Sequence, residues 1–188
     1  EIDLIQMREN PVPILESFGV DLVLCGHSHC YVRSFLMRGH YANSTSLTPS
    51  MILDNGSGRS DDTGAYTKFT TGPTVNQGTV YVVAGSSGWA TSGLLNHPAM
   101  YISWLRMGSL VLDVDGQTLQ AKFLRENGDI DDYFSIIKVD SMLRVTALRQ
   151  AADSMMLTWQ SLPGKQYQVA HTPELTSPIW NPVSGSIP

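Results

Sequence analysis

The feature that most constrains the fold of this chain is an apolar run, Val20 to Cys25, that stops at Gly26. Only Asp21 interrupts the run, and such a run is typical of an α/β strand that is buried on both faces. Gly26 lets the backbone turn closely, and His27 and His29 follow it directly. Because open α/β sheets bind ligands beyond the carboxyl ends of their strands, we expect a functional site in this loop.

The segment before the strand, residues 1–20, is expected to be helical. Pro11 suits the first position of a helix, and Gly19 suits the residue just past a helix end. The pattern therefore predicts either one helix kinked near Pro11 or two short helices, with Phe18 facing inward.

After residue 20 the chain is expected to be rich in strands. Expected strands cover residues 31–37, 51–53, 79–84, 109–114, 118–124 and 133–139. The turn Asp115-Gly116 predicts a hairpin. Residues 55–77 are expected to form a long loop of the functional or mobile kind, in which Asp61 and Asp62 are solvated. Residues 89–107 are expected to be irregular.

The character of the sequence changes after Asp140. Short alternating segments at 143–148, 155–159 and 167–170 indicate a β-sandwich, with Trp159 as its core aromatic residue. Because a sandwich takes about 100 residues, residues 141–188 are expected to be its front half, with an unpaired edge. The predicted domains are 1–140 and 141–188.

Composition excludes some classes of protein. A net charge of −5 over 188 residues argues against nucleic acid as a partner, since that would require a basic face. No apolar run reaches the roughly 18 residues of a membrane span. Cys25 is expected to be a buried thiol, and no disulfide to Cys30 is expected, so the cysteines leave the compartment open.

The histidine pair suits metal binding. Residues i and i+2 of an extended segment point the same way, so His27 and His29 are expected to face one cavity. Two metals about 3.5–4 Å apart would each take one imidazole. Ordinary surface or core histidines are the alternative. A cupin would have glutamate where Val32 and Arg33 stand, and an amidohydrolase barrel would need further strand–helix repeats.

The block from Gly26 to Arg33, Gly-His-Ser-His-Cys-Tyr-Val-Arg, resembles the last motif of the calcineurin-like metallophosphoesterases, in the purple acid phosphatase-like branch. That motif reads Gly-His-x-His-x-Tyr-Glu-Arg. Gly39–Tyr41, Val82–Gly88 and Asn96–Pro98 are also similar to that branch, and the resemblance covers residues 1–140. Val32 departs from the motif, at a position that is not a metal ligand in the family.

The resemblance implies an α/β fold, the C-terminal half of a four-layer α/β/β/α sandwich, followed by a partial fibronectin type III-like module. It implies that His27 ligates one metal and His29 the other, in a pair of divalent or trivalent ions of iron, zinc or manganese. The family's Asp-x-His and Gly-Asn-His-Glu blocks are absent from this sequence, and its Gly-Asp-x-x-Asp block is expected together with them. They and the general acid or base are expected upstream, so the chain alone is expected to bind metal weakly and to be inactive.

The function implied is metal-dependent hydrolysis of a phosphate ester, either a small molecule or a phosphorylated substrate, in an extracellular or periplasmic enzyme. The alternative is a non-enzymatic extracellular binding or adhesion protein, which the β-rich second half would suit.

Other candidate residues have two interpretations each. His40 either approaches the metals or caps a turn, and His97 either shapes a substrate mouth or packs. Tyr31 either orients a ligand or lies in a strand core. Arg33 is expected to point to solvent or a carboxylate, with a phosphate contact as the alternative. His171, in the trailing module, is expected to have no role.

Overall fold

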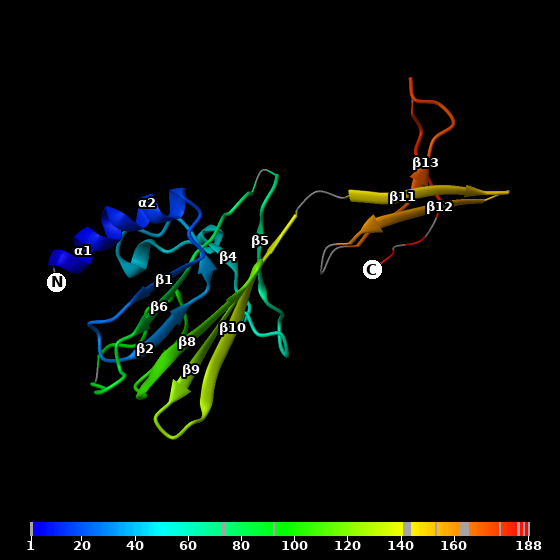
Figure 1. Cartoon of the computed structure of the whole chain (residues 1–188). Coiled ribbons are helices and arrows are strands. Elements are labelled where there is room, and N and C mark those ends of the chain that lie inside the picture. Colours follow the sequence, from blue (N-terminus) through cyan, green and yellow to red (C-terminus); the bar gives the residue numbers. More distant parts are fainter. Residues whose placement is uncertain are drawn as a thin grey trace. The chain divides into compact units, whose positions relative to one another are not determined.

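The chain is rich in β-strands and has few helices (Figure 1). The computed structural model describes residues 2–72, 74–91, 93–140, 144–152, 154–161, 166–176, 178–183, 185 and 187. The chain divides into two compact units, Glu1–Asp140 and Ser141–Pro188. The assignment of these units to a catalytic domain and a fibronectin type III-like module stays a prediction.

The first unit opens with two short helices, α1 (Ile2–Glu9) and α2 (Pro11–Ser17). The break falls at Asn10, since Pro11 has no N–H to continue the hydrogen bonds of α1. This confirms the second of the two alternatives, two short helices rather than one kinked helix.

Helix α2 ends at Ser17, two residues before Gly19, as the position of this glycine in the sequence indicates. The N–H of Val20 donates to the carbonyl of Leu15 at 3.2 Å, and that of Gly19 to the carbonyl of Glu16 at 3.0 Å. Gly19 has φ of 69°, so this is a Schellman motif. The expectation for Phe18 is wrong: its side chain is 82% exposed, because Phe18 lies past the last helical residue, where the chain turns away.

The first sheet contains the strand that leads to the histidines. Its order is β1-β6-β2-β7, formed by Leu22–Cys25, Val80–Ala84, Tyr31–Ser34 and Met100–Trp104. Strand β1 pairs in parallel with β6, and the other two pairs are antiparallel.

The prediction that β1 is buried on both faces is wrong. The strand lies at the edge of its sheet, and Leu24 is 46% exposed. Cys25 is an exposed free thiol, whereas Cys30 is the buried one. An edge strand has one neighbour only, so an apolar run does not by itself ensure burial.

The second sheet has the order β5-β10-β9-β8, formed by Tyr66–Phe69, Ile130–Val139, Thr118–Arg125 and Gly108–Asp115. Strands β8 and β9 form the predicted hairpin, in which Asp115 pairs with Thr118. Two smaller strands, β3 (Leu36–Met37) and β4 (Ile52–Asp54), pair with each other. Short 3₁₀ turns lie at Ser44–Ser46 and Pro49–Met51.

The core lies between the two sheets. Tyr31 of β2 stacks on Phe123 of β9, with ring centroids 3.9 Å apart. The buried cluster comprises Tyr31, Leu36, Tyr66, Val80, Val82, Ala121, Phe123, Phe134 and Ile136. Tyr81 points to the opposite face of β6, where its hydroxyl donates to Glu16 of α2 at 2.6 Å.

The layers described are therefore the helices, the first sheet and the second sheet (Figure 1). Within the described part of the first unit, no helix adds a fourth layer. The four-layer sandwich stays a prediction.

Two strands of the first unit were not expected from the sequence. Strand β5 lies inside the predicted loop 55–77, and β7 lies inside the stretch 89–107 that was expected to be irregular. Strand β5 pairs in parallel with β10, and β7 pairs with β2 next to a register shift. Both depend on partners far away in the sequence, which local patterns do not reveal.

The second unit contains a hairpin of β11 (Arg144–Ala151) and β12 (Ser154–Gln160). A shorter pair is formed by β13 (Ala170–His171) and β14 (Asn181–Pro182). Trp159 is partly buried, and its ring centroid lies 6.0 Å from that of Tyr167. Leu143, the predicted start of the first of these strands, lies outside the described residues.

Candidate metal site

The loop between β1 and β2 consists of two successive three-residue turns. The N–H of Ser28 donates to the carbonyl of Gly26 at 2.9 Å, and that of Cys30 to the carbonyl of Ser28 at 2.8 Å. His27 and His29 are the central residues of these turns. His27 has φ of 68°, as in the rare and strained form of this turn. The segment is therefore not extended, and the turns direct the two side chains.

A second loop, between β6 and β7, holds the histidine loop in place. The N–H of Gly85 donates to the carbonyl of Cys30 at 3.2 Å, and that of Thr91 to the carbonyl of His29 at 3.0 Å. A Cβ atom on Gly85 would lie 2.1 Å from the carbonyl oxygen of Ser28. Only glycine permits this approach, so the two loops form one packed unit.

His27 and His29 line one open cavity of about 530 Å³. Both residues are exposed, so their imidazoles are accessible to a ligand. Val32 and His97 line the same cavity. The departure from the family motif at Val32 therefore lies in the wall of this cavity. Both interpretations of His97, as part of a substrate mouth and as a packed side chain, stay predictions.

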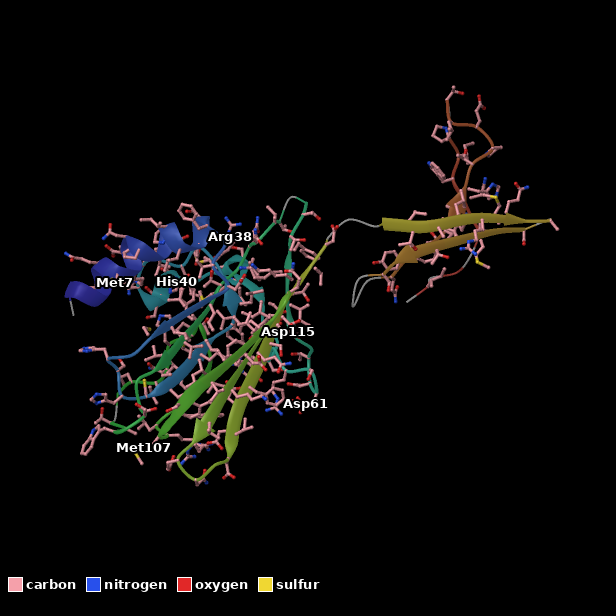
Figure 2. The ribbon with its side chains drawn as sticks, viewed as in Figure 1. Met7, Arg38, His40, Asp61, Met107 and Asp115 are labelled. Carbon is pink, nitrogen blue, oxygen red and sulfur yellow. The ribbon has the colours of Figure 1, made fainter. Side chains whose placement is uncertain are left out.

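The described residues contain no group of three or more His, Cys, Asp or Glu side chains that would hold a metal ion. The paired acids do not approach the histidines: Asp61 forms an exposed ion pair with Arg59 at 3.0 Å. Both Asp61 and Asp62 are exposed, as predicted. Figure 2 shows Asp61 well away from the helices. A metal at His27 or His29 would therefore need further ligands.

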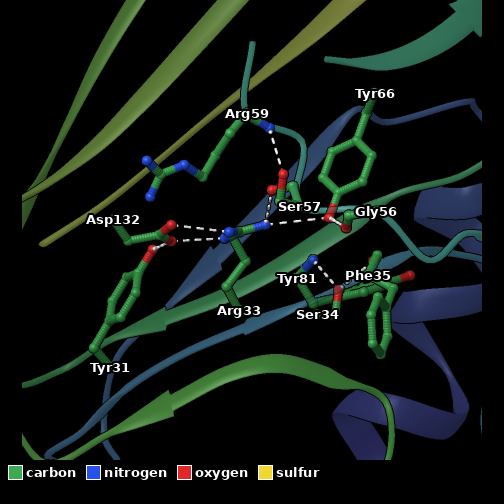
Figure 3. Close-up of polar contacts among 10 residues, drawn as sticks. All are labelled: Tyr31, Arg33, Ser34, Phe35, Gly56, Ser57, Arg59, Tyr66, Tyr81 and Asp132. Atoms are coloured by element: carbon green, nitrogen blue, oxygen red, sulfur yellow. Dashed lines mark hydrogen bonds and ion pairs between the residues drawn. The ribbon is translucent and has the colours of Figure 1, made fainter. Parts of the chain in front are cut away.

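Arg33 is buried and does not face a substrate (Figure 3). Its Nε and Nη2 atoms donate to the two carboxylate oxygens of Asp132, at 2.7 and 2.9 Å. Its Nη1 atom donates to the carbonyl of Ser57 at 3.0 Å and to the hydroxyl of Tyr66 at 3.1 Å. The carboxylate partner was one of the expected alternatives, and the phosphate contact is wrong.

Tyr31 belongs to the same buried network. Its hydroxyl donates to Asp132 Oδ2 at 2.6 Å. Burial, and then the carboxylate of Asp132, raise the pKa of the Tyr31 phenol, so it stays protonated and remains a donor. The strand-core interpretation of Tyr31 is therefore correct, and the network joins the two sheets.

The single acid in the apolar run, Asp21, also has long-range partners. Lys68 Nζ lies 2.7 Å from Asp21 Oδ1, and Lys138 Nζ lies 2.9 Å from Oδ2. Lys68 also donates to the carbonyls of Gly19 and Val20. These contacts tie the start of β1 to the second sheet and so support the strand that carries the histidine loop.

His40 and His97 form a pair, with ring centroids 5.5 Å apart. Ser46 Oγ donates its hydrogen to the carbonyl of Asn43. In its 3.5 Å contact with His40 Nδ1 the serine oxygen is therefore the acceptor, and we assign the ring hydrogen to Nδ1. His40 Nε2 is then a buried acceptor without a partner. His97 Nδ1 accepts the N–H of Ala99 at 3.2 Å, so neutral His97 carries its hydrogen on Nε2. His40 does not line the cavity of His27 and His29.

The pair makes stability dependent on pH. Burial lowers the pKa of His40 and of His97, and Arg8 adds to both effects. In the unfolded chain these imidazoles become protonated near pH 6.5, whereas in the folded chain they stay neutral until a lower pH. We expect the unfolding free energy to fall as pH drops from about 7 toward 5.5, and this dependence to weaken in His40→Gln and His97→Gln. Urea denaturation at a series of pH values measures it.

The control for this experiment is His171→Gln, because His171 is exposed in the second unit. It should keep the full pH dependence. If His40→Gln combined with His97→Gln kept the dependence as well, the pair would not be its source.

No protein-family model matches the chain, and no curated protein matches it. Among solved structures, the chain is similar to a purple acid phosphatase from seeds of yellow lupin (Lupinus luteus), with a TM-score of 0.47 and 17% identity. The match covers 72% of this chain and 20% of that one, so the chain spans one fifth of the length of the phosphatase. Within the described residues, every helix is too short or too polar to cross a lipid bilayer.

Proposed function

We propose that this chain contributes one side of the two-metal centre of a phosphoester hydrolase. His27 would ligate one metal and His29 the other. The observation that carries the proposal is the strained turn at His27, with φ of 68°, in a loop whose two histidines line one cavity. Strained residues that the surrounding structure holds in place cluster at functional sites. The resemblance of the block Gly26–Arg33 to the metallophosphoesterase motif adds support.

The two ions would be divalent or trivalent iron, zinc or manganese. When bound, such a pair polarises a phosphoryl oxygen and lowers the pKa of a bound water. His27 and His29 would hold the ions through neutral imidazoles. The cavity volume, about 530 Å³, is within the range of small-molecule sites and suits a phosphate ester or a phosphorylated side chain. The other ligands and the general acid or base would come from residues outside this sequence.

The second unit allows a different proposal, a non-enzymatic extracellular binding module. It exposes several large apolar side chains, among them Met155, Met156, Trp180 and Val183. Under either proposal the protein would act in an extracellular or periplasmic location, with residues 141–188 as a partial fibronectin type III-like module.

The deciding experiment is metal analysis of the chain joined to its upstream ligand-bearing region. We expect His27→Ala and His29→Ala each to lose one bound ion. We also expect phosphatase turnover to fall by more than the roughly 10–100-fold that outer-shell partners of a metal cost. Metal content is measured by mass spectrometry and turnover with a chromogenic phosphate ester.

The matched control is His171→Ala, which should retain both ions, since His171 lies in the other unit. Unchanged metal content in His27→Ala would contradict the proposal. So would tight metal uptake and rapid turnover by residues 1–188 alone, because His27 and His29 are too few ligands for such a centre.

A further inference from the structure

A second cavity, of about 190 Å³, lies between the helices and the first sheet. We call it the helix-side cavity. Its ionisable wall includes Arg8, His40 and His97, and its apolar wall includes Met37, Ala99 and Met100. Arg8 comes from α1, and His40 lies on the loop after β3 (Figure 2). Residues far apart in the sequence thus bring three nitrogen-bearing side chains and an apolar surface to one cavity.

No acidic side chain among the described residues lines this cavity. Glu16, which is bonded to the lining residue Tyr81, already has three donors. Its carboxylate accepts the N–H of Gly39 at 2.8 Å and the hydroxyls of Tyr41 and Tyr81 at 2.6 Å each. The cavity wall therefore offers no carboxylate to the guanidinium of Arg8.

Arg8 is only loosely neutralised. Its Nη2 atom lies 3.7 Å from Glu9 Oε1, and both side chains are at least a third exposed, at 36% and 53%. Its Nε atom donates to the carbonyl of Tyr41 at 3.0 Å, which fixes the guanidinium without removing its charge. The remaining donors of Arg8 are available to an anion.

His40 supplies an independent sign of a missing ligand. The residue is only 9% exposed, and its Nε2 atom is buried without a partner. Burying a polar atom unsatisfied costs stability, so its presence indicates a site where a partner binds. His97 offers an N–H at Nε2, because its Nδ1 atom accepts the N–H of Ala99.

We propose that the helix-side cavity binds a small organic carboxylate. The carboxylate would lie among Arg8, His40 and His97, and its short apolar body would pack on Met37, Ala99 and Met100. The volume equals that of about six water molecules, which fits an acid of butyrate size. Inorganic phosphate fits less well, because it would leave the apolar wall uncovered and would lose part of its hydration without replacement.

The proposal includes proton uptake and no covalent step. At neutral pH a carboxylate ion enters, and one proton from solvent moves to His40 Nε2, which then donates to a carboxylate oxygen. Burial, and then Arg8 of α1, oppose this proton and lower the pKa of His40. The other ionisable groups beside His40 are His97, which packs against its ring, and Tyr81, whose hydroxyl is occupied by Glu16. The negative charge of the bound carboxylate favours the protonated form of His40, so the affinity for the carboxylate increases as pH falls.

The test uses the whole 188-residue chain, with butyrate and inorganic phosphate as the two probes. Calorimetry in buffers of different ionisation enthalpy, at about pH 6 and about pH 7.5, measures affinity and proton uptake together. We expect butyrate to take up nearly one proton and to bind about tenfold more tightly at the lower pH. Phosphate should not displace it at equal concentration.

Two variants locate the site. Arg8→Gln should weaken butyrate about tenfold by removing a charged donor. His40→Gln should remove the proton uptake, and His171→Gln should change neither. Arg8 is partly exposed, so its variant is expected to fold, which far-UV circular dichroism verifies even if the His40 variant is unstable.

Three results would overturn the proposal. They are no butyrate binding at either pH, unchanged binding in Arg8→Gln, and displacement of butyrate by equimolar phosphate. The last would identify a general oxyanion site with no use for the apolar wall. None of these results bears on metal binding at His27 and His29, which this experiment leaves unloaded.

Discussion

Arg33→Met is expected to lower the free energy of unfolding by about 3–5 kcal/mol, the cost of removing one partner of a buried ion pair. The reason is Asp132, which is 1% exposed and is bound by two guanidinium nitrogens. In the variant its carboxylate would remain buried with only the hydroxyl of Tyr31. Urea denaturation of the isolated chain, followed by circular dichroism, measures the loss.

Two further variants separate the buried charge from simple loss of packing. Arg33→Met combined with Asp132→Leu should regain most of the stability, because apolar replacement of a whole buried pair is often nearly neutral. Arg59→Met should change little, since Arg59 and Asp61 pair at the surface, with side chains 34% and 56% exposed. If Arg33→Met lost no more than Arg59→Met, the network would not stabilise the fold.

Gly85→Ala is expected to displace the histidine loop. The added Cβ would lie 2.1 Å from the carbonyl oxygen of Ser28, and backbone at that position cannot rotate aside as a side chain would. We expect a loss of about 1–3 kcal/mol in unfolding free energy, as for other overpacked sites. We also expect shifted imidazole resonances of His27 and His29 in NMR spectra.

The matched control lies three residues further on, at Gly88, where a Cβ would meet nothing within 4 Å. Gly88→Ala should leave both the stability and the two histidine spectra close to those of the unchanged chain. Equal effects at the two glycines would mean that the approach of the loops does not position the histidines.

Local patterns predicted the elements that depend on local chemistry. Gly19 marked the end of α2, because glycine adopts positive φ readily. Asp115-Gly116 predicted the hairpin of β8 and β9, although the turn lies one residue later, at Gly116 and Gln117, since Asp115 pairs with Thr118. The strand before Gly26 was also placed correctly, because the run of apolar residues and the glycine that ends it are both local features of the sequence.

The features that the sequence did not predict depend on partners that lie far away in the chain. Arg33 and Asp132 are 99 positions apart, so nothing near Arg33 indicated a buried carboxylate. Asp21 interrupts an apolar run, and its countercharges, Lys68 and Lys138, lie 47 and 117 positions away. The exposure of Cys25 follows from the edge position of β1, which only the order of strands reveals.

In the candidate site, too, local features were predicted and long-range geometry was not. The residues His27 and His29 were identified from sequence, but their turn geometry was not, because extended and turned backbone share the same His-x-His pattern. The role of Gly85 was also missed, since a close approach between two loops has no local signal beyond the glycine itself. His97 reaches the cavity only because β7 pairs with β2.

The two parallel strand pairs have a consequence for how the chain acquires its fold. The hydroxyl of Thr79, next to β6, donates to the carbonyl of Val20, two residues before β1 and 59 positions away; the hydroxyl of Thr70 donates to the end of β10 across 69 positions. Closing a loop of that length lowers the chain entropy before the contacts that stabilise it have formed. Folds with many such long-range strand pairs therefore form slowly. The apolar strand at Leu24 is thus expected to stay unpaired during synthesis until β6 has been made, and an unpaired strand is prone to aggregate.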